Sequence, residues 1–180
     1  METDVSTVKK GTFELNLGFV KLGADLDEED RQCAWELYTE ITTRVAVCGK
    51  RGDPECTNFD DELYVESLDS LHRFFQEARL IMRRFPVGKL KGLGQNEAHL
   101  GVLISRIMAN VLRPFLEKWQ VKYRHWWEHE SNPRLAPLAR QAGFAQVDKF
   151  LADWAAVRCI MRAVRDELVQ AYDLVDVEPK

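Results

Sequence analysis

Four stretches of this chain carry apolar residues at three- and four-residue steps, and segments that contain proline or glycine separate them. This spacing places the apolar side chains on one face of an α-helix. The helices are expected over residues 27–48, 61–85, 95–126 and 147–168. Helices of similar length joined by short connections are typical of an antiparallel bundle. The sequence therefore predicts an all-α fold, in the form of an up-and-down four-helix bundle.

The third of these helices contains Pro114, which has no backbone N–H to donate. We therefore expect a kinked or locally broken third helix. Near the ends of the chain, residues 12–17 alternate apolar and polar side chains as a half-buried strand does, and residues 174–177 are the other strand-like segment. A lone strand leaves its backbone groups unpaired, so we expect the two segments to pair with each other or with another chain.

The length of 180 residues fits one domain, which we assign to residues 11–180 after a polar, disordered tail of residues 1–10. The net charge of −4 argues against a dedicated duplex nucleic-acid binder, although a local basic patch is compatible with nucleic acid. The most apolar stretch, residues 102–112, is interrupted by Arg106 and is shorter than the roughly 20 residues that cross a bilayer. We therefore expect no membrane span.

The cysteines show no zinc-ligand spacing, and we interpret them as reduced thiols of a cytoplasmic protein. They are Cys33, Cys48, Cys56 and Cys159. Di-iron chemistry is not expected either, because the interior stripes lack the paired Glu-x-x-His motifs that it requires. We predict no cofactor and no metal site. On the fourth helix, Arg158, Arg162 and Arg165 share one face, where nearby acids are expected to neutralise them.

Three interpretations overlap in residues 124–130. First, Arg124 and His129 match the R-x4-H spacing of the helical HEPN ribonucleases. In such a site the histidine acts as general base and the arginine stabilises the developing phosphate charge. Second, residues 125–129 match H-x-x-E-H, the inverted zinc-peptidase motif, but that chemistry needs a further ligand and a larger chain. Third, the segment is the solvated, mixed polar end of a helix, and this interpretation we favour.

Adjacent Trp126 and Trp127 cannot both face one core, because neighbours on a helix point about 100° apart. With Trp119 and Tyr123 they predict an aromatic interaction surface, unless residues 131–144 cover them.

The second candidate site is a group of basic residues at the end of the second expected helix and in the glycine-containing loop that follows, residues 88–96. Its cations are Arg79, Arg83, Arg84, Lys89 and Lys91. A helix that begins after such a loop can hold an anion through its backbone donors, although the P-loop order of residues is absent.

Several short stretches resemble an uncharacterised bacterial family of small all-helical proteins that is associated with conflict or antiviral-defence loci. They are residues 34–38, 43–45, 68–75, 113–116 and 118–119. The resemblance implies a helical fold and a defence-type setting, and it carries no catalytic residue. Where the family has a histidine after the tryptophan, this chain has Gln120.

No catalytic set stands out, so we expect a non-catalytic helical protein-interaction module, an adaptor or regulator that binds a protein partner or itself. Its aromatic helix end or its terminal strands would make the contact. Two alternatives stay open at this point. One is a HEPN-like endoribonuclease that uses Arg124 and His129, and the other is a sensor for an anionic ligand or nucleotide at the 88–96 loop.

Overall fold

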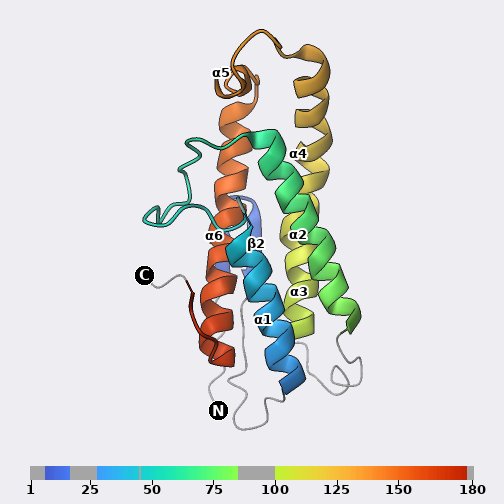
Figure 1. Cartoon of the computed structure of the whole chain (residues 1–180), viewed down its shortest axis with the longest axis vertical. Helices are drawn as coiled ribbons and strands as arrows, with labels where there is room; N and C mark the ends of the chain where they lie inside the picture. The colour runs from blue at the N-terminus through green and yellow to red at the C-terminus, as the bar shows by residue number, and fades with distance from the viewer. Residues whose placement is uncertain (1–6, 17–27, 45, 85–99, 178–180) are drawn as a thin grey trace.

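The computed structural model describes residues 7–16, 28–44, 46–84 and 100–177, and these parts are mostly helical (Figure 1). The all-α class is confirmed. The helices are α1 (Glu28–Thr43), α2 (Tyr64–Arg84), α3 (Leu100–Ile107), η2 (Met108–Leu112), α4 (Arg113–His125), η3 (Trp126–Glu130), α5 (Pro137–Gln141) and α6 (Val147–Tyr172). The segments η2 and η3 are π-helical. In the described part of the chain, no helix combines the length and apolar character needed to cross a membrane.

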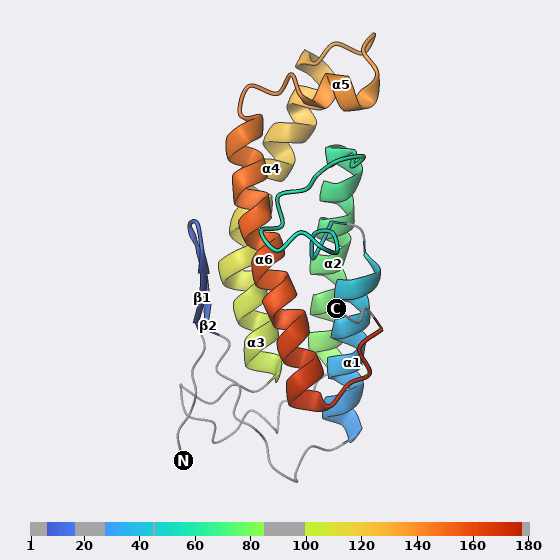
Figure 2. The same cartoon turned by 90° about the vertical axis from the view of Figure 1, so that its left-hand side faces the viewer.

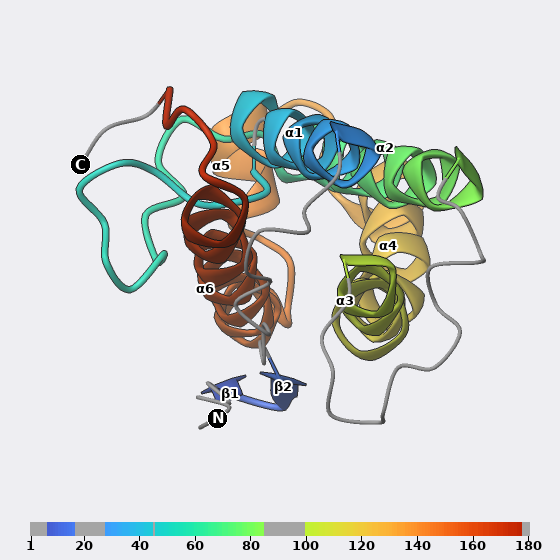
Figure 3. The ribbon, with the colours of Figure 1, turned by 90° about the horizontal axis from the view of Figure 1, so that it is seen from below.

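The long helices pack around one core. Helix α1 lies against α2 and α6, while α4 lies against α2 and α6 from the other side. Figure 3 shows this arrangement from the end of the molecule. The up-and-down order of the bundle stays a prediction, because the connection at residues 85–99 lies outside the described residues.

Aromatic side chains fill the core at the end of the bundle near α5. The rings of Phe115 and Tyr123 from α4 stack on Phe150 of α6 and that of Trp119 packs on it at a tilt, with ring centres 5.2 to 6.2 Å apart. Large aromatic groups remove much apolar surface from water, so this cluster contributes strongly to holding α4 on α6.

The third long helical segment changes its hydrogen bonding just before Pro114. The N–H of Arg113 donates to the carbonyl of Met108, five residues earlier, so η2 is a wider π-turn between α3 and α4. Because Pro114 has no N–H, the carbonyl four residues before it loses its α-helical partner, and the wider turn accommodates this loss. The helical backbone therefore continues through this π-turn into α4, and the predicted kink or break stays a prediction.

The strand-like segment near the N-terminus pairs within the chain, and not with residues 174–177 as the sequence suggested. Strands β1 (Thr7–Lys10) and β2 (Phe13–Asn16) form an antiparallel hairpin in which Lys10 pairs with Phe13. Its turn contains Gly11 at φ 59°, a conformation that glycine adopts without strain. The hairpin lies on α6 and η2, on the side away from α1 and α2 (Figure 2). Residues 7–10, expected in a disordered tail, thus form a strand.

Residues 174–177 have no assigned strand, and they dock on α1 through a tyrosine. The hydroxyl of buried Tyr38 donates to the Asp176 carboxylate at 2.9 Å and accepts the N–H of Val177 at 2.7 Å. The C-terminal segment is therefore held by a side chain of α1, and not by a second strand.

Candidate functional site

The R-x4-H residues lie where α4 passes into η3. The guanidinium of Arg124 forms an ion pair with Asp69 of α2. The exposed ring of His129 lies 3.8 Å from the Glu128 carboxylate, and its centre is 4.9 Å from that of His125. Neither side chain is buried in the core. Their contacts hold them to different neighbours, so the described geometry does not join the guanidinium and the imidazole in one site.

The two histidines of the H-x-x-E-H match do lie on one face of the helix. Besides its approach to the His129 ring, His125 contacts Glu130 at 3.3 Å. Within the residues that the structure describes, no three histidine, cysteine, aspartate or glutamate side chains are grouped to hold a metal ion. We therefore interpret this segment as a solvated helix end, in which the histidines and the carboxylates they contact are exposed.

The predicted aromatic interaction surface is largely covered. Trp119 and Tyr123 are fully buried in the core, so neither is available to a partner on the surface, and this part of the prediction is wrong. Trp126 packs on Phe144 with ring centres 5.2 Å apart, and the Arg140 guanidinium lies 3.9 Å from the centre of the Trp127 ring. The connection that follows η3 thus covers both of these half-buried tryptophans.

The group of basic residues that forms the second candidate site is described only in part. Arg83 and Arg84 are exposed in the last turn of α2, and Arg84 pairs with Glu36 of α1 at 2.8 Å. Lys89, Lys91 and the rest of the 88–96 loop lie outside the described residues. The anion-binding interpretation therefore has no described geometry to support it.

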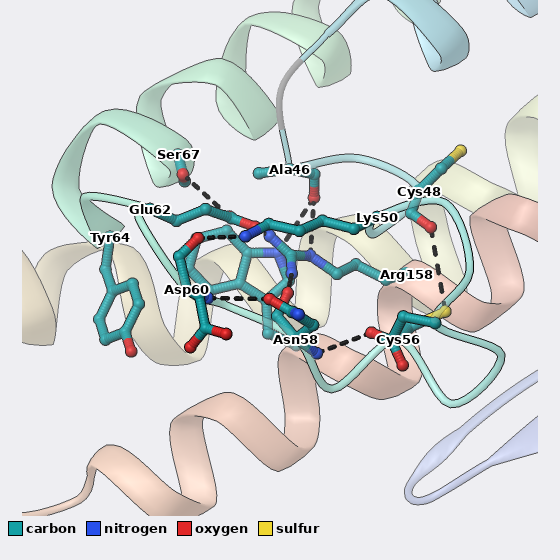
Figure 4. Close-up of polar contacts among 12 residues, drawn as sticks. Ala46, Cys48, Lys50, Cys56, Asn58, Asp60, Glu62, Tyr64, Ser67 and Arg158 are labelled. Carbon is teal, nitrogen blue, oxygen red and sulfur yellow. Dashed lines mark hydrogen bonds and ion pairs between the residues drawn. The ribbon is translucent and has the colours of Figure 1, made fainter.

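A buried polar network joins α6 to the loop before α2 (Figure 4). The Arg158 side chain, which is 0% exposed, forms an ion pair with Glu62, which is 8% exposed. Its guanidinium also donates to the carbonyls of Ala46 at 3.2 Å and Asn58 at 3.3 Å, and its centre lies 4.1 Å from that of the Phe59 ring. Burial lowers the pKa of Arg158, and the Glu62 carboxylate opposes this effect.

The next arginine along α6 holds the same loop from its other side. Arg162 donates to the carbonyls of Asp53 at 2.6 Å, Cys48 at 3.0 Å and Lys50 at 3.1 Å. Buried carbonyls need donors, and the arginines supply them where the loop has no secondary structure. Because the donors of Arg158 and Arg162 are used on the chain itself, we interpret the network as structural.

A further candidate site is a groove of about 670 Å³ between α2 and the α3–η2–α4 segment. Its apolar lining consists of Phe75, Met108, Ala109, Leu116 and Val121. Its polar and charged lining consists of His72, Arg79, Ser105, Arg113, Glu117 and Gln120. The volume falls within the range of about 300–1,000 Å³ that is usual for small-molecule sites, and an apolar wall with a few polar groups is the usual chemistry of such sites.

Two lining groups of the groove have no partner among the described residues. The buried Nδ1 of His72 accepts or donates no hydrogen bond there, while its Nε2 lies 3.0 Å from the amide nitrogen of Gln76. If that amide donates to Nε2, the ring proton sits on Nδ1, which then is a donor without an acceptor. Arg79 is exposed and makes no ion pair within the described part of the chain. Arg113, by contrast, pairs with Glu117 at 2.7 Å.

Sequence reasoning missed this groove, although two signals for it were present. Met108 and Ala109 lie in the π-turn, and π-turns are frequent at functional sites, but Pro114 alone does not reveal that the turn is π-helical. Val121, which is 74% exposed, is an apolar residue outside the core-facing stripe. An apolar side chain at such a position can mark a surface that a partner covers.

Comparison with known proteins gave no family match: no family model, no curated protein and no solved structure matches the chain. The function is therefore argued from the geometry of the groove.

Proposed function

We propose that this chain is a non-catalytic interaction module that binds an amphipathic helix of a partner protein in the groove between α2 and α3–η2–α4. The observation that carries the proposal is the groove itself, whose lining includes five apolar residues from α2, η2 and α4. Packing an amphipathic helix into an apolar groove is a common mode of peptide recognition. In keeping with the resemblance to defence-associated helical proteins, we infer an adaptor or regulator in the cytoplasm of a bacterial cell.

The shape of the groove favours a helix over a compact small molecule. The lining residues run from Ser105 to Val121, which is roughly 24 Å along a helix at 1.5 Å per residue. A groove of that length along one helix suits a partner helix that lies over it and inserts an apolar stripe.

The polar groups of the groove favour acidic residues beside that stripe. Arg79 of α2 is exposed and offers a positive charge at the edge of the groove. The other charged lining residues, Arg113 and Glu117, neutralise each other. A carboxylate on the partner would satisfy Arg79, and charge complementarity of this kind sets the orientation of a bound helix.

The experiment uses a fluorescent peptide of about 16 residues, with leucines at helical i, i+4, i+7 and i+11 spacing and glutamates beside them. Fluorescence anisotropy measures its Kd for the full chain, for Ala109→Glu and for Asn110→Glu. Ala109 is exposed and lines the groove, whereas its exposed neighbour Asn110 does not line it. The two variants add the same charge to the same π-turn, so they are matched for fold and net charge.

We expect binding by the wild-type chain, at least about a tenfold weaker Kd for Ala109→Glu and a change within about twofold for Asn110→Glu. A peptide with serines in place of the leucines should not bind. Absence of binding, or equal weakening by both variants, overturns the proposal. A concentration-dependent dimer that Ala109→Glu alone dissolves would also overturn it, because the groove would then hold a second copy of this chain.

A further inference from the structure

Two cysteines that are far apart in the sequence lie against each other where α6 meets the loop before α2. Cys56 is fully buried in that loop at φ 57°, and Cys159 is partly exposed on α6. The Cys56 thiol donates to the carbonyl of Cys48 at 3.9 Å, and the Cys159 thiol donates to that of Pro54 at 3.9 Å. The Cys159 sulfur is also 3.4 Å from the carbonyl oxygen of Glu55, the residue before Cys56. Both thiols are free.

The loop is packed closely enough around Cys56 to hold it in place. A Cβ atom added to Gly49 would lie 3.2 Å from the Cβ of Cys56 and 3.2 Å from the Arg162 guanidinium. Arg162 itself donates to three carbonyls of the loop. The position of Cys56 relative to α6, and hence to Cys159, is therefore set by several contacts and not by one.

The surroundings give the two thiols different roles. Lys10 of the hairpin pairs with the Glu55 carboxylate at 3.3 Å, and the Cys159 thiol donates to the carbonyl of the same residue. The thiolate is the reactive form of cysteine. Burial raises the pKa of the Cys56 thiol to about 12, so this thiol stays protonated at neutral pH. Cys159 is thus the thiol that solvent oxidants reach, with Cys56 behind it.

We propose that Cys56 and Cys159 are a modification site, at which a hydroperoxide oxidises the pair to an intramolecular disulfide. The Cys159 thiolate attacks the peroxide, the O–O bond breaks, and the leaving oxygen takes a proton, which yields a sulfenic acid and one water or alcohol. The Cys56 sulfur then attacks the Cys159 sulfur, and the S–O bond breaks. The departing hydroxide takes the Cys56 proton as water. A thiol reductant returns the two electrons and restores both thiols.

The experiment treats the reduced full chain with hydrogen peroxide, alkylates the remaining thiols under denaturing conditions and maps the peptides by mass spectrometry. We expect a product lighter by about 2 Da before alkylation, with Cys56 and Cys159 joined in one cross-linked peptide. Added dithiothreitol should remove the cross-link. The matched controls are Cys33→Ser and Cys48→Ser, which replace the other two cysteines and should leave the cross-link unchanged.

Two variants separate the roles of the thiols. Cys159→Ser should abolish both the cross-link and any sulfenic acid that dimedone can trap. Cys56→Ala should abolish the cross-link and leave a dimedone adduct on Cys159. Circular dichroism checks that each variant keeps the helix content of the wild-type chain. The proposal is overturned if the wild-type chain does not form the Cys56–Cys159 cross-link, or if it forms a cross-link through Cys48 instead.

Discussion

Arg158 of α6 and Glu62, two residues before α2, form an ion pair inside the core of the molecule. The pair ties the longest helix to a loop that has little secondary structure of its own. A buried charge without a partner is costly, whereas a buried pair with further hydrogen bonds is tolerated. Arg158 has such bonds to the carbonyls of Ala46 and Asn58, and the Ser67 hydroxyl donates to Glu62 at 3.4 Å.

Removing one member of this pair should destabilise the fold strongly, and removing both should cost less than the sum of the two single losses. Arg158→Met and Glu62→Gln are each expected to lower the free energy of unfolding by about 3–5 kcal/mol, because each leaves its partner buried without a counter-charge. The double variant should lose less than the sum of the two. Urea unfolding followed by circular dichroism gives the three values. Additive losses would show that the pair is not coupled.

The exposed ion pair of Arg124 and Asp69 is the control for this cycle. Their side chains are 42% and 38% exposed, so solvent screens the attraction between them. Arg124→Met should therefore change the free energy of unfolding by less than about 1 kcal/mol. A loss as large as that of Arg158→Met would mean that burial does not explain why one ion pair contributes more to stability than the other.

Removing the hydroxyl group from each of two buried tyrosines should have different effects on stability. The hydroxyl of Tyr123 has no hydrogen-bond partner among the described residues, whereas that of Tyr38 bonds to Asp176 and Val177. Tyr123→Phe removes an unsatisfied polar group and should leave stability unchanged or raise it by about 1 kcal/mol. Tyr38→Phe should lower it by about 1–2 kcal/mol. Thermal unfolding of both variants measures this, and an equal loss in both would contradict the assignment.

Stability should fall as the pH rises above about 10. Burial raises the pKa of Tyr64, Tyr123 and Tyr172 above the usual value of a phenol. Below that usual value the phenols are protonated in both the folded and the unfolded chain, so they cause no pH dependence. Above it the unfolded chain releases protons that the folded chain retains, and the free energy of unfolding falls by up to about 1.4 kcal/mol per pH unit for each tyrosine.

Absorbance and circular dichroism together test this pH dependence. All four tyrosines of the chain are buried, so phenolate absorbance should stay low until the helical signal is lost. Phenolate that forms while the helical signal is intact would show that the hydroxyls titrate in the folded state. Tyr123→Phe should make the free energy of unfolding fall less steeply with pH, because one of the three tyrosines with a raised pKa is then absent.

The ribonuclease alternative makes a separate prediction. Arg124 pairs with Asp69 and His129 contacts residues of its own helix, so no joint site for a phosphate is described. We expect no RNA cleavage above background by the wild-type chain, and the same result for His129→Ala. Gel electrophoresis of a labelled RNA, with size-exclusion mass measured on the same samples, provides the test. Cleavage by the wild-type chain that His129→Ala abolishes would replace our proposal with the ribonuclease.

The helices show what local sequence can predict. Residues such as Leu71 on α2 and Val164 on α6 recur at helical spacing, and both are buried as expected. The π-turn before Pro114 was not predicted as such, because a missing N–H shows where an α-helix must change but not what replaces the lost bond. The strand at residues 13–16 was also predicted, yet its partner was not, since pairing depends on where β1 lies in space.

The candidate sites show what local sequence cannot predict. Arg158 was expected to be neutralised by acids near it on the helix, but its partner is Glu62, 96 residues away. Trp119 and Tyr123 were expected on an interaction surface, but the packing of α4 on α6 places them in the core.

The sequence by itself determined the helical class and most of the inward-facing positions, because the period of an α-helix is a local property of the chain. The tertiary structure decided which charges meet, which aromatics are covered, which two cysteines come near each other and where an apolar groove opens. Each of these depends on how distant segments pack, and the spacing of residues along one helix carries no information about the neighbour that the helix will find.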